Sequence, residues 1–422
     1  MAILAQFFCG RDEGHVFIAD AKGGDPSITG FPLEPVVSET LDYFKGILEG
    51  GESEAGEALR SLVEPIVEHS AEDEVVWIVP HNILHYLPFH ALPTKEGFLG
   101  FRNPVCYTPS ASTLPVCRRG PRLDGKPVIS IGDPTQDLRY ARLEAERVAE
   151  AFNGESLLER KATKQRLFAE LEKHEAVDIL HLACHGQAGA DDASQSGVFL
   201  APDRISQNNE PDMLTAGEIV RHRLHAALVT ISACNAGFGA VEASDEVLGL
   251  TRSLLYAGAS SVLLSYWPLD DFSTYLIIER SYEELRRMIA EGAGNKANAV
   301  RAGQRYVHDL TIKDLVARCD VSAEQCAARS DIHGQLDLLI EGAEWVTMAG
   351  DLQEALQRYH NIQNLIDASP AAFAGQTDSI QDQIEQVELQ ILLGGEPIDY
   401  SAHPFSEERH WAGFFLHGDW RL

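Results

Sequence analysis

Residues 178–189 read DILHLACHGQAG, an apolar run that breaks into a Cys-His-Gly turn. A second stretch at 228–239, LVTISACNAGFG, repeats the arrangement with Cys234 at its turn. Neither run alternates between apolar and polar residues, which is typical of strands covered on both faces of a parallel sheet. Functional groups in such sheets lie where strands end and loops begin, so each stretch delivers a thiol or an imidazole to such a position.

The chain around these two stretches alternates between short apolar runs and amphipathic segments of helical period. Between residues 128 and 309, strands and helices follow one another in the order that βαβ units require. We therefore predict an α/β fold, a three-layer sandwich built on a mostly parallel sheet. The strands predicted here lie at 128–132, 155–159, 176–184, 196–202, 226–234 and 259–269, with earlier strands at 3–8, 15–19 and 74–80.

The domain organisation follows from changes in composition. A charged stretch rich in Pro and Gly at 118–127 indicates a linker. Residues 311–395 carry no strand signal and are polar, Gln-rich and helical. The terminal HWAGFFLHGDWRL (410–422) is aromatic, and we expect it to return as a strand to a sheet edge.

The helical stretch at 343–370 has small and aromatic residues at helix-packing spacing. This pattern resembles a tetratricopeptide-repeat helix pair, although only one copy is visible and any helical hairpin would also explain it. The residues concerned are Ala343, Trp345, Gly350, Ala355, Tyr359 and Pro370.

The charge of the chain limits its partners. There are 34 Lys and Arg against 64 Asp and Glu, a formal net charge of −30. So acidic a surface repels phosphate backbones, and we do not expect a nucleic acid as a substrate. Solubility is the simplest explanation of the excess, and basic peptide segments are compatible partners.

Cysteine usage and hydropathy indicate the compartment. The seven cysteines are scattered without a CxxC pair, so neither a disulfide framework nor a zinc ribbon is predicted. The N-terminal apolar run is too short for a signal peptide, and no run approaches the roughly 18 apolar residues of a membrane helix. We expect a soluble, cytoplasmic protein without membrane contact.

A cysteine and a histidine on neighbouring strands could carry out nucleophilic acyl transfer. If the strands that precede them are neighbours, His185 and Cys234 meet at one edge, where the imidazole takes the thiol proton and the thiolate attacks a carbonyl. Successive residues of a strand point to opposite faces, so Cys184 should point inward when His185 faces the site. We also expect the backbone N–H groups of Gly186 and Cys234 to form an oxyanion hole.

Two groups of side chains suggest a metal instead. A zinc site at the strand ends competes with the dyad but conflicts with the same alternation of side chains. A second group of histidines lies in an irregular loop, without a carboxylate or thiolate at ligand spacing. We therefore predict no metal and no cofactor. The first group is His181, Cys184, His185 and Cys234, and the second is His81, His85 and His90.

The stretch SYWPLDD (265–271) leaves a buried strand close to the expected nucleophile strand. Its Trp267, Asp270 and Asp271 are candidate substrate-binding residues, because carboxylates here could bind an Arg or Lys side chain before the scissile bond. The alternative is that these Asp residues cap the helix that begins at about 272. Asp245 and Glu246 are weaker candidates of the same kind.

Several motifs together resemble the CHAT family, a caspase-like peptidase domain often joined to tetratricopeptide repeats. The interval of 49 residues between His185 and Cys234 agrees with the spacing of about 50 in caspases. The resemblance implies a caspase-fold cysteine endopeptidase of bacterial type with a His185–Cys234 dyad. It covers most of 70–310 and about the last 20 residues, through VVWIVPHNILHYLPFHAL, HLACHG, ISACNAG, SDEVLGLTRSLLYAGASSVLLSYWPLDD, KANAVRAGQ and HPFSEERHWAGFFLHGDW.

The resemblance also implies an organisation of the chain. We expect a non-catalytic caspase-like half at 1–120, a catalytic domain at 125–310, a tetratricopeptide-like insertion at 311–395 and a strand within 396–422 that returns to the peptidase. The family's repeats usually precede the peptidase, whereas these helices interrupt its end. We expect protein substrates, and a regulatory protein or an activating protease as partner. The alternatives are an inactive caspase-like scaffold, and a Cys-His hydrolase or transferase acting on small acyl substrates.

Overall fold

The computed structural model describes residues 2–20, 23–50, 55–189, 193–204, 210–233, 246–373, 375–395 and 397–422, without the side chains of 193 and 246–248. The chain divides into two compact units. The first comprises residues 1–307 and 408–422, and the second comprises residues 308–407. In the described part of the chain, no helix is long and apolar enough to cross a membrane.

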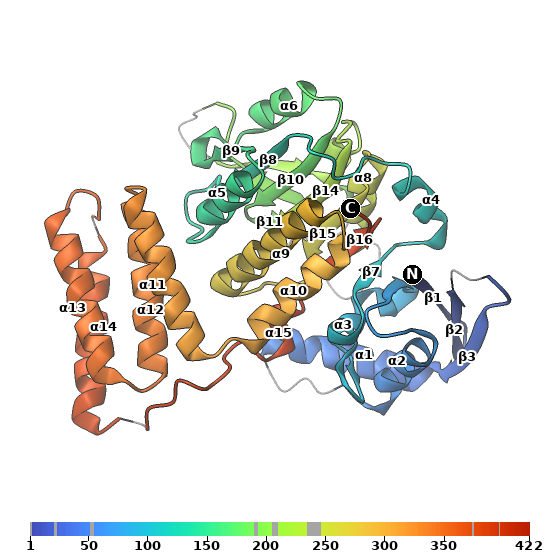
Figure 1. Ribbon diagram of the computed structural model, residues 1–422, viewed down its shortest axis with the longest axis horizontal. Coiled ribbons are helices and arrows are strands. Elements are labelled where there is room, and N and C mark those ends of the chain that lie inside the picture. The colour runs from blue at the N-terminus through green and yellow to red at the C-terminus, as the bar shows by residue number, and fades with distance from the viewer. Residues whose placement is uncertain are drawn as a thin grey trace. The chain divides into compact units, whose positions relative to one another are not determined.

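One large sheet organises the first unit (Figure 1). Eleven strands of the described chain pair in a single order, and most neighbours are parallel. In sheet order they are β3 (Ser27–Pro32), β2 (Glu13–Asp20), β1 (Ala2–Cys9), β4 (Val75–Val79), β7 (Val105–Tyr107), β16 (Phe414–Gly418), β15 (Ser261–Ser265), β14 (Ala226–Ser232), β10 (Val177–Ala183), β8 (Val128–Gly132) and β9 (Glu155–Leu158).

Helices cover this sheet on both faces. The connection from β8 to β9 and the connections from β10 through β14 to β15 run in opposite directions along the sheet. Because crossovers between parallel strands are right-handed, their helices lie on opposite faces. One layer therefore contains α5 (Ala141–Ala151), which packs against α9 (Asp271–Glu291), and the other contains α7 (Ala216–Ile219) and α8 (Glu246–Tyr256). The predicted α/β three-layer fold with a mostly parallel sheet is confirmed.

The remaining elements of the first unit are shorter or lie around this core. The helices are α1 (Leu33–Glu49), α2 (Glu57–His69), α3 (Leu99–Arg102), α4 (Leu114–Cys117), α6 (Lys164–Glu172), α10 (Lys296–Asp309) and α15 (Glu408–Trp411). Two small sheets occur in the described part of this unit: β5 (Pro93–Thr94) with β6 (Gly97–Phe98), and β11 (Gly186–Gln187) with β12 (Gly197–Leu200) and β13 (Asp212–Thr215).

The C-terminal strand β16 lies in the interior of the sheet, so our expectation that it returns to a sheet edge was wrong. It pairs antiparallel with β15 along its whole length and meets β7 in parallel at the pair His417–Tyr107. All five of its residues are buried, as suits a strand with neighbours on both sides and layers on both faces. The strand therefore joins the two halves of the sheet.

A buried lysine fastens the end of this strand. Lys296 is 2% exposed, and its ammonium donates to the backbone oxygens of Ala227 (2.9 Å) and Asp419 (3.2 Å) and to Ser261 Oγ (3.0 Å). Burial, opposed by the charge of Asp419, lowers the pKa of Lys296 to about 8. All three donors of the ammonium have acceptors, so α10 is tied to β14, β15 and the residues after β16.

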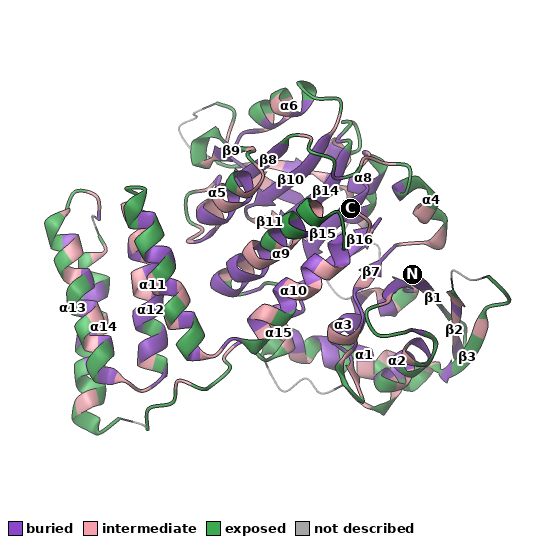
Figure 2. Cartoon of the chain, in the orientation of Figure 1, coloured by how far each residue is buried: buried purple, intermediate pink, exposed green. Residues whose placement is uncertain are grey.

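The described residues of the second unit form four helices of equal length. They are α11 (Ile312–Ala328), α12 (Ile332–Met348), α13 (Leu352–Ala368) and α14 (Thr377–Leu393). Side chains of Thr311, Asp331 and Asp351 cap the first three at intervals of 20 residues. Each helix packs on the next in the chain, and each buries one stripe and exposes the other (Figure 2). This is the stacking of a helical repeat array.

Several residues of the predicted repeat pattern lie at these helix contacts. Ala343, Ala355 and Tyr359 are fully buried in one cluster with Leu336 and Ile380. Gly350 takes a left-handed φ of 81° in the turn between α12 and α13, where a side chain would be strained. Small residues at the contacts thus let the helix backbones approach closely.

Candidate active site

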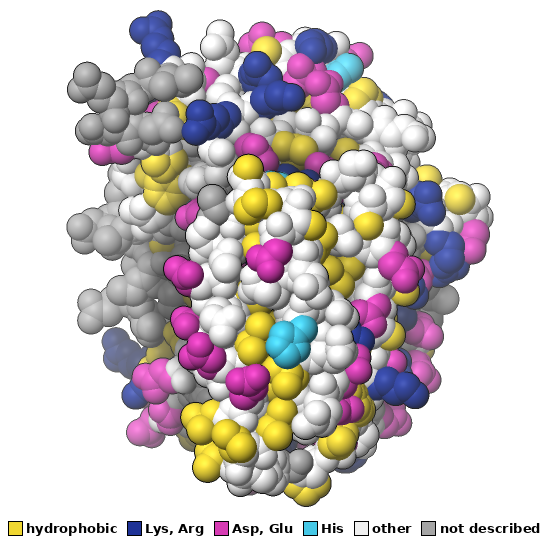
Figure 3. Space-filling model, turned by 90° about the vertical axis from the view of Figure 1, so that its left-hand side faces the viewer, with side chains coloured by type: hydrophobic (Ala, Val, Ile, Leu, Met, Phe, Trp, Pro, Cys, Tyr) yellow, Lys and Arg dark blue, Asp and Glu magenta, His cyan; other side chains and the backbone are white. Residues whose placement is uncertain are grey.

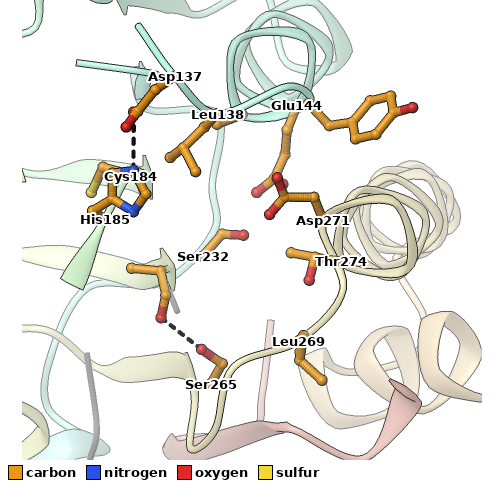
Figure 4. Close-up of a pocket in the computed structure, with 13 residues that line it drawn as sticks. Asp137, Leu138, Glu144, Cys184, His185, Ser232, Ser265, Leu269, Asp271 and Thr274 are labelled. Carbon is orange, nitrogen blue, oxygen red and sulfur yellow. Dashed lines mark hydrogen bonds and ion pairs between the residues drawn. The ribbon is translucent and has the colours of Figure 1, made fainter. Parts of the chain in front are cut away.

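Three strand ends meet at one edge of the sheet. In the parallel register, Ala183 of β10 lies beside Gly132 of β8 and Ser232 of β14. The residues at and after these strand ends, together with Ser265 of the neighbouring β15 and residues from there to the start of α9, surround one pocket of about 330 Å³ (Figure 4). Its lining is Asp137, Leu138, Tyr140, Ala141, Glu144, Cys184, His185, Ser232, Ala233, Ser265, Leu269, Asp271 and Thr274.

The imidazole of His185 is oriented by a carboxylate. His185 Nε2 lies 3.0 Å from Asp137 Oδ1, and His185 is 37% exposed. Against the opposing effect of burial, hydrogen bonds from Thr135 and His185 lower the pKa of Asp137, which is therefore ionised at neutral pH. Within the described residues no other side chain bonds to this ring, so Nδ1 is left for a reaction partner.

A second aspartate holds the loop that carries Asp137. Asp133 Oδ1 accepts the backbone N–H groups of Asp137 (3.0 Å) and Leu138 (3.1 Å), and its own N–H donates to Ala183 O (3.0 Å). Its φ of 47° is left-handed, a conformation that Asp tolerates better than most residues. Asp133 thus fixes the position of Asp137 against β10. Our sequence reasoning missed both residues, although DPTQD (133–137) directly follows the strand at 128–132 and has the composition of an Asx turn.

The thiol beside His185 is not exposed. Cys184 is 1% exposed, and burial, followed by the charge of Glu144, raises its pKa well above the ordinary value. Its N–H donates to Ser232 O across the strands (3.2 Å). A thiol that stays protonated is a poor nucleophile, so Cys184 packs as a small apolar side chain.

The predicted nucleophile Cys234 lies outside the described residues, as do Asp245 and the side chain of Glu246. The described residues just before Cys234 reach the site, since Ser232 and Ala233 line the pocket. Ser265 Oγ donates to Ala233 O (2.8 Å) and holds the end of β14 against β15. The chain therefore leaves β14 at the pocket wall.

The two aspartates of SYWPLDD have different roles. Asp270 caps α9, with Oδ1 accepting the N–H of Ser273 at 2.8 Å. Asp271 lines the pocket, and burial, followed by the charges of Asp270 and Glu144, raises its pKa. Trp267 is 1% exposed and donates from Nε1 to Arg409 O (3.0 Å), so it lies in the core and not in the pocket. Of the two alternatives considered for these aspartates, Asp270 therefore has the position of a helix cap and Asp271 has a position in the pocket.

A further carboxylate shares the pocket with Asp271. Glu144 is 3% exposed, and Figure 4 shows its carboxylate pointing toward that of Asp271. Its Oε1 lies 2.9 Å from Nε2 of His181, a histidine with no exposed surface. The end of the pocket away from His185 is therefore acidic, and sequence reasoning did not identify Glu144.

The backbone N–H of Gly186 is not used in the pairing of β11 with β12. The N–H of Phe199 donates to His185 O (2.9 Å), and Gly186 lies opposite Val198 in the ladder of β11 and β12. Hydrogen-bonded and non-hydrogen-bonded pairs alternate in an antiparallel ladder, so the Gly186 pair is of the second kind. Its N–H therefore points away from β12.

The histidines considered as metal ligands have separate surroundings. His81 Nδ1 accepts the N–H of Cys9 (3.1 Å), whereas His90 lies between Tyr107 OH (2.7 Å) and Ala412 O (2.9 Å). Over the described ranges, no group of three or more His, Cys, Asp or Glu side chains is arranged to hold a metal.

Comparisons with known proteins bear on this site. The family model described as CHAT domain matches residues 53–419. Tetratricopeptide repeat protein 28 of Mus musculus and its Homo sapiens counterpart are each 25% identical to the chain over 199 residues. The match covers 40% of this chain but only 8% of the length of either relative.

Solved structures of a cysteine proteinase are also similar. The Arg-specific cysteine proteinase gingipain R matches with a TM-score of 0.40 and 9% identity, over 62% of this chain and 68% of that chain. The complex of the pro- and mature domains from Porphyromonas gingivalis matches with a TM-score of 0.36 and 10% identity, over 65% and 72%.

Proposed function

Because the chain belongs to the CHAT domain family, we propose that it is a cysteine endopeptidase with Cys234 as nucleophile and His185 as general base. The observation that carries the proposal is the 3.0 Å contact between His185 and Asp137 at the carboxyl edge of the sheet. This edge is shared with β14, the strand that runs toward Cys234. A histidine held by a carboxylate beside the expected position of a thiol is the arrangement of nucleophilic acyl transfer.

The chemistry divides between these groups as follows. The His185 imidazole removes the thiol proton, and the Cys234 thiolate forms a bond to the scissile carbonyl carbon. The imidazolium then protonates the amine that leaves when the C–N bond breaks. Water hydrolyses the remaining thioester and regenerates the thiol. The ionised Asp137 stabilises the imidazolium and keeps Nε2 protonated, so that Nδ1 faces the reaction.

The negative oxygen of the tetrahedral intermediate needs donors. The Gly186 N–H is a suitable one, because it points away from β12 and belongs to the residue after His185. The backbone N–H of Cys234 would be the second donor of this oxyanion hole.

The acidic end of the pocket suggests the residue before the scissile bond. Asp271 and Glu144 are partly or fully desolvated there, and a carboxylate in such a place binds a guanidinium or an ammonium strongly. We infer a preference for Arg or Lys, with Asp271 as the principal partner and no direct part for Asp270 or Trp267. Asp245 stays a candidate.

An unbiased peptide library provides the test. We expect the full chain to cleave a subset of peptides after Arg or Lys, with loss of cleavage after iodoacetamide or in Cys234→Ala. A regulatory protein or an activating protease belongs to the same proposal, so candidates of each kind are added in parallel. Absence of cleavage under all these conditions, with a normal melt, would favour the inactive scaffold. Labelling by an acyl-ester probe but not by a peptidyl electrophile would favour a small-molecule acyl hydrolase or transferase.

A further inference from the structure

The outer face of helix α14 carries two kinds of side chain in one stripe. Buried Ile380, Ile384 and Val387 pack on the unit, which fixes the opposite side as exposed. On that side, residues three or four apart run along the helix, first acidic and then apolar. The stripe is Asp378, Asp382, Glu385, Leu389, Leu392 and Leu393, and we call it the α14 stripe.

The leucines of this stripe are unusually exposed for their type. Leu389 is 56% exposed, Leu392 83% and Leu393 79%. Three adjacent exposed leucines on one helical face differ from the single exposed apolar residues that any surface has. Figure 3 shows hydrophobic and acidic side chains interspersed on the face that it draws.

The charge of the unit defines what can cover this face. Residues 308–407 contain 18 Asp and Glu against 4 Lys and Arg, a net charge of −14. Helix α14 itself contains four acidic residues and no basic one. An occupant must therefore be basic where it faces the first half of the stripe and apolar where it faces the second.

The stacking of the unit gives the shape of the occupant. Each helix from α11 to α14 packs on the next one, and α14 ends the series. Its outer face is thus the place where one more helix would continue the array. The stripe runs over about 22 Å, the length of a helix of about 15 residues.

A second copy of the chain fits this face poorly. In an antiparallel pair of α14 helices, the carboxylates of each copy would lie against the leucines of the other. In a parallel pair, carboxylates would face carboxylates. Both arrangements bury unpaired charge or bring like charges together, so the face is not complementary to itself.

We propose that the α14 stripe binds a basic amphipathic helix of a partner protein, which packs on α14 as the next helix of the array. Apolar side chains of that helix cover Leu389, Leu392 and Leu393, and its Lys or Arg side chains pair with Asp378, Asp382 and Glu385. This binding is independent of the proposed peptidase reaction, because no residue of the site takes part in it.

The test measures binding of two synthetic peptides to the full chain by fluorescence anisotropy. The peptides have 18 residues and the same composition of Leu, Lys and Ala. On one face of its helix, the first peptide carries Lys over one half of the length and Leu over the other half, to match the stripe. The second peptide permutes the order so that no such face forms. We expect the first to bind at least about tenfold more tightly, with affinity falling as salt rises.

Variants assign the binding to the stripe. L389A/L392A/L393A should weaken binding about tenfold or more while keeping a good helix former at each position. D378N/D382N/E385Q should weaken it and flatten its salt dependence. The matched control, V321A/E324Q, changes an exposed apolar and an exposed acidic residue of α11 and should leave binding unchanged.

Four results would overturn the proposal. They are no binding of the amphipathic peptide, equal binding of both peptides, equal loss in the α11 control, and a parent chain that self-associates but becomes monomeric in L389A/L392A/L393A. The last result, read by sedimentation, would make a second copy the occupant.

Discussion

Asp270 and Asp271 are consecutive residues with opposite surroundings: the carboxylate of Asp270 caps helix α9, whereas that of Asp271 lines the pocket beside Glu144. The cap satisfies the N–H of Ser273 and needs no ligand. Burial, followed by the charges of Asp270 and Glu144, raises the pKa of Asp271. A cation in the pocket would therefore stabilise its ionised form. A substitution of Asp271 therefore tests the pocket, and a substitution of the neighbouring Asp270 serves as its control.

We expect Asp271→Asn to lower kcat/KM for peptides with Arg before the scissile bond by roughly 10- to 100-fold, since a charged hydrogen bond is lost. Asp270→Ala should leave this preference unchanged and cost about 1 kcal/mol of stability through loss of the cap. Cleavage profiles and chemical denaturation of the two variants check both statements. A preference for apolar or acidic residues that neither variant alters would contradict the basic pocket.

Cys184 and the proposed nucleophile Cys234 should behave differently on substitution. Cys234→Ala should abolish cleavage without a change in the melt. Cys184→Ala should keep appreciable activity, because its buried thiol has a pKa too high for a nucleophile, and should cost only about 1 kcal/mol of stability. Rates and melting curves of both variants decide the assignment, which is reversed if Cys184→Ala is inactive while Cys234→Ala turns over.

Substitution of the proposed base His185 should lower the rate more than substitution of Asp137, the carboxylate that contacts it. We expect His185→Ala to lose about 10²- to 10⁴-fold in kcat, the range of general acid–base catalysis. Asp137→Asn should lose less, because Asp137 is 62% exposed and water can partly replace it, but its rate should fall measurably. Asp137→Glu keeps the carboxylate but shifts it by one methylene group, so its rate shows whether the charge alone is enough or whether its position beside His185 also matters. An unchanged rate in His185→Ala would refute the dyad.

Local sequence patterns predicted where the strands lie in the chain better than they predicted which strands lie side by side in the sheet. The apolar runs at 176–184 and 226–234 identified β10 and β14, because burial on both faces leaves a direct mark on composition. The place of β16 depends on pairing with β7 and β15, which are far away in the chain, so the expected sheet edge was wrong. No local pattern records which strands will flank another.

The same limit applies to the site. His185 was identified because it follows a buried strand and precedes a glycine. Asp137 becomes its partner only because β8 lies beside β10, and nothing near residue 137 indicates that adjacency. Trp267 lies two residues beyond the end of β15, but its indole donates to Arg409 O in the core, since the direction of a side chain after a strand is not set by spacing.

Acid should weaken the joint between the two halves of the sheet. Burial, opposed by the hydrogen bond to Ala412, lowers the pKa of His90 from 6.5 to about 4, and burial, followed by the charge of His85, lowers that of His417 to about 3. Both histidines are neutral when folded, and both contact Tyr107. Their stabilising effect is complete above about pH 6.5, the unfolded value, and is lost as pH falls toward the folded values.

At pH 5, each histidine should lower the free energy of unfolding by about 2 kcal/mol relative to pH 7.5. We expect His417→Gln, which keeps an acceptor for Tyr266 OH but does not titrate, to remove its share of this loss. Urea denaturation of parent and variant at both pH values measures the difference. Identical pH dependence in the two proteins would show that His417 is not protonated on unfolding.

We expect the unit 308–407 to control the proposed peptidase. This unit lies in the chain between α10 and the interior strand β16, so the sheet is completed only through it. Its entry and exit are close together, because Ile312 N donates to Ala402 O at 3.0 Å. A Gly/Ser linker of about three residues can therefore replace 312–402 without strain on either end. We consider two kinds of control: a regulatory partner that binds the unit, or an activating cleavage site within 367–379, where most described residues are exposed although Phe373 is buried. In either case, this shortened chain should no longer respond to the partner or the protease that changes the parent's rate. A cooperative melt first shows that it folds, and a reporter peptide ending in Arg then compares the two rates. A shortened chain that matches the parent in rate and in response would show that the insertion is passive.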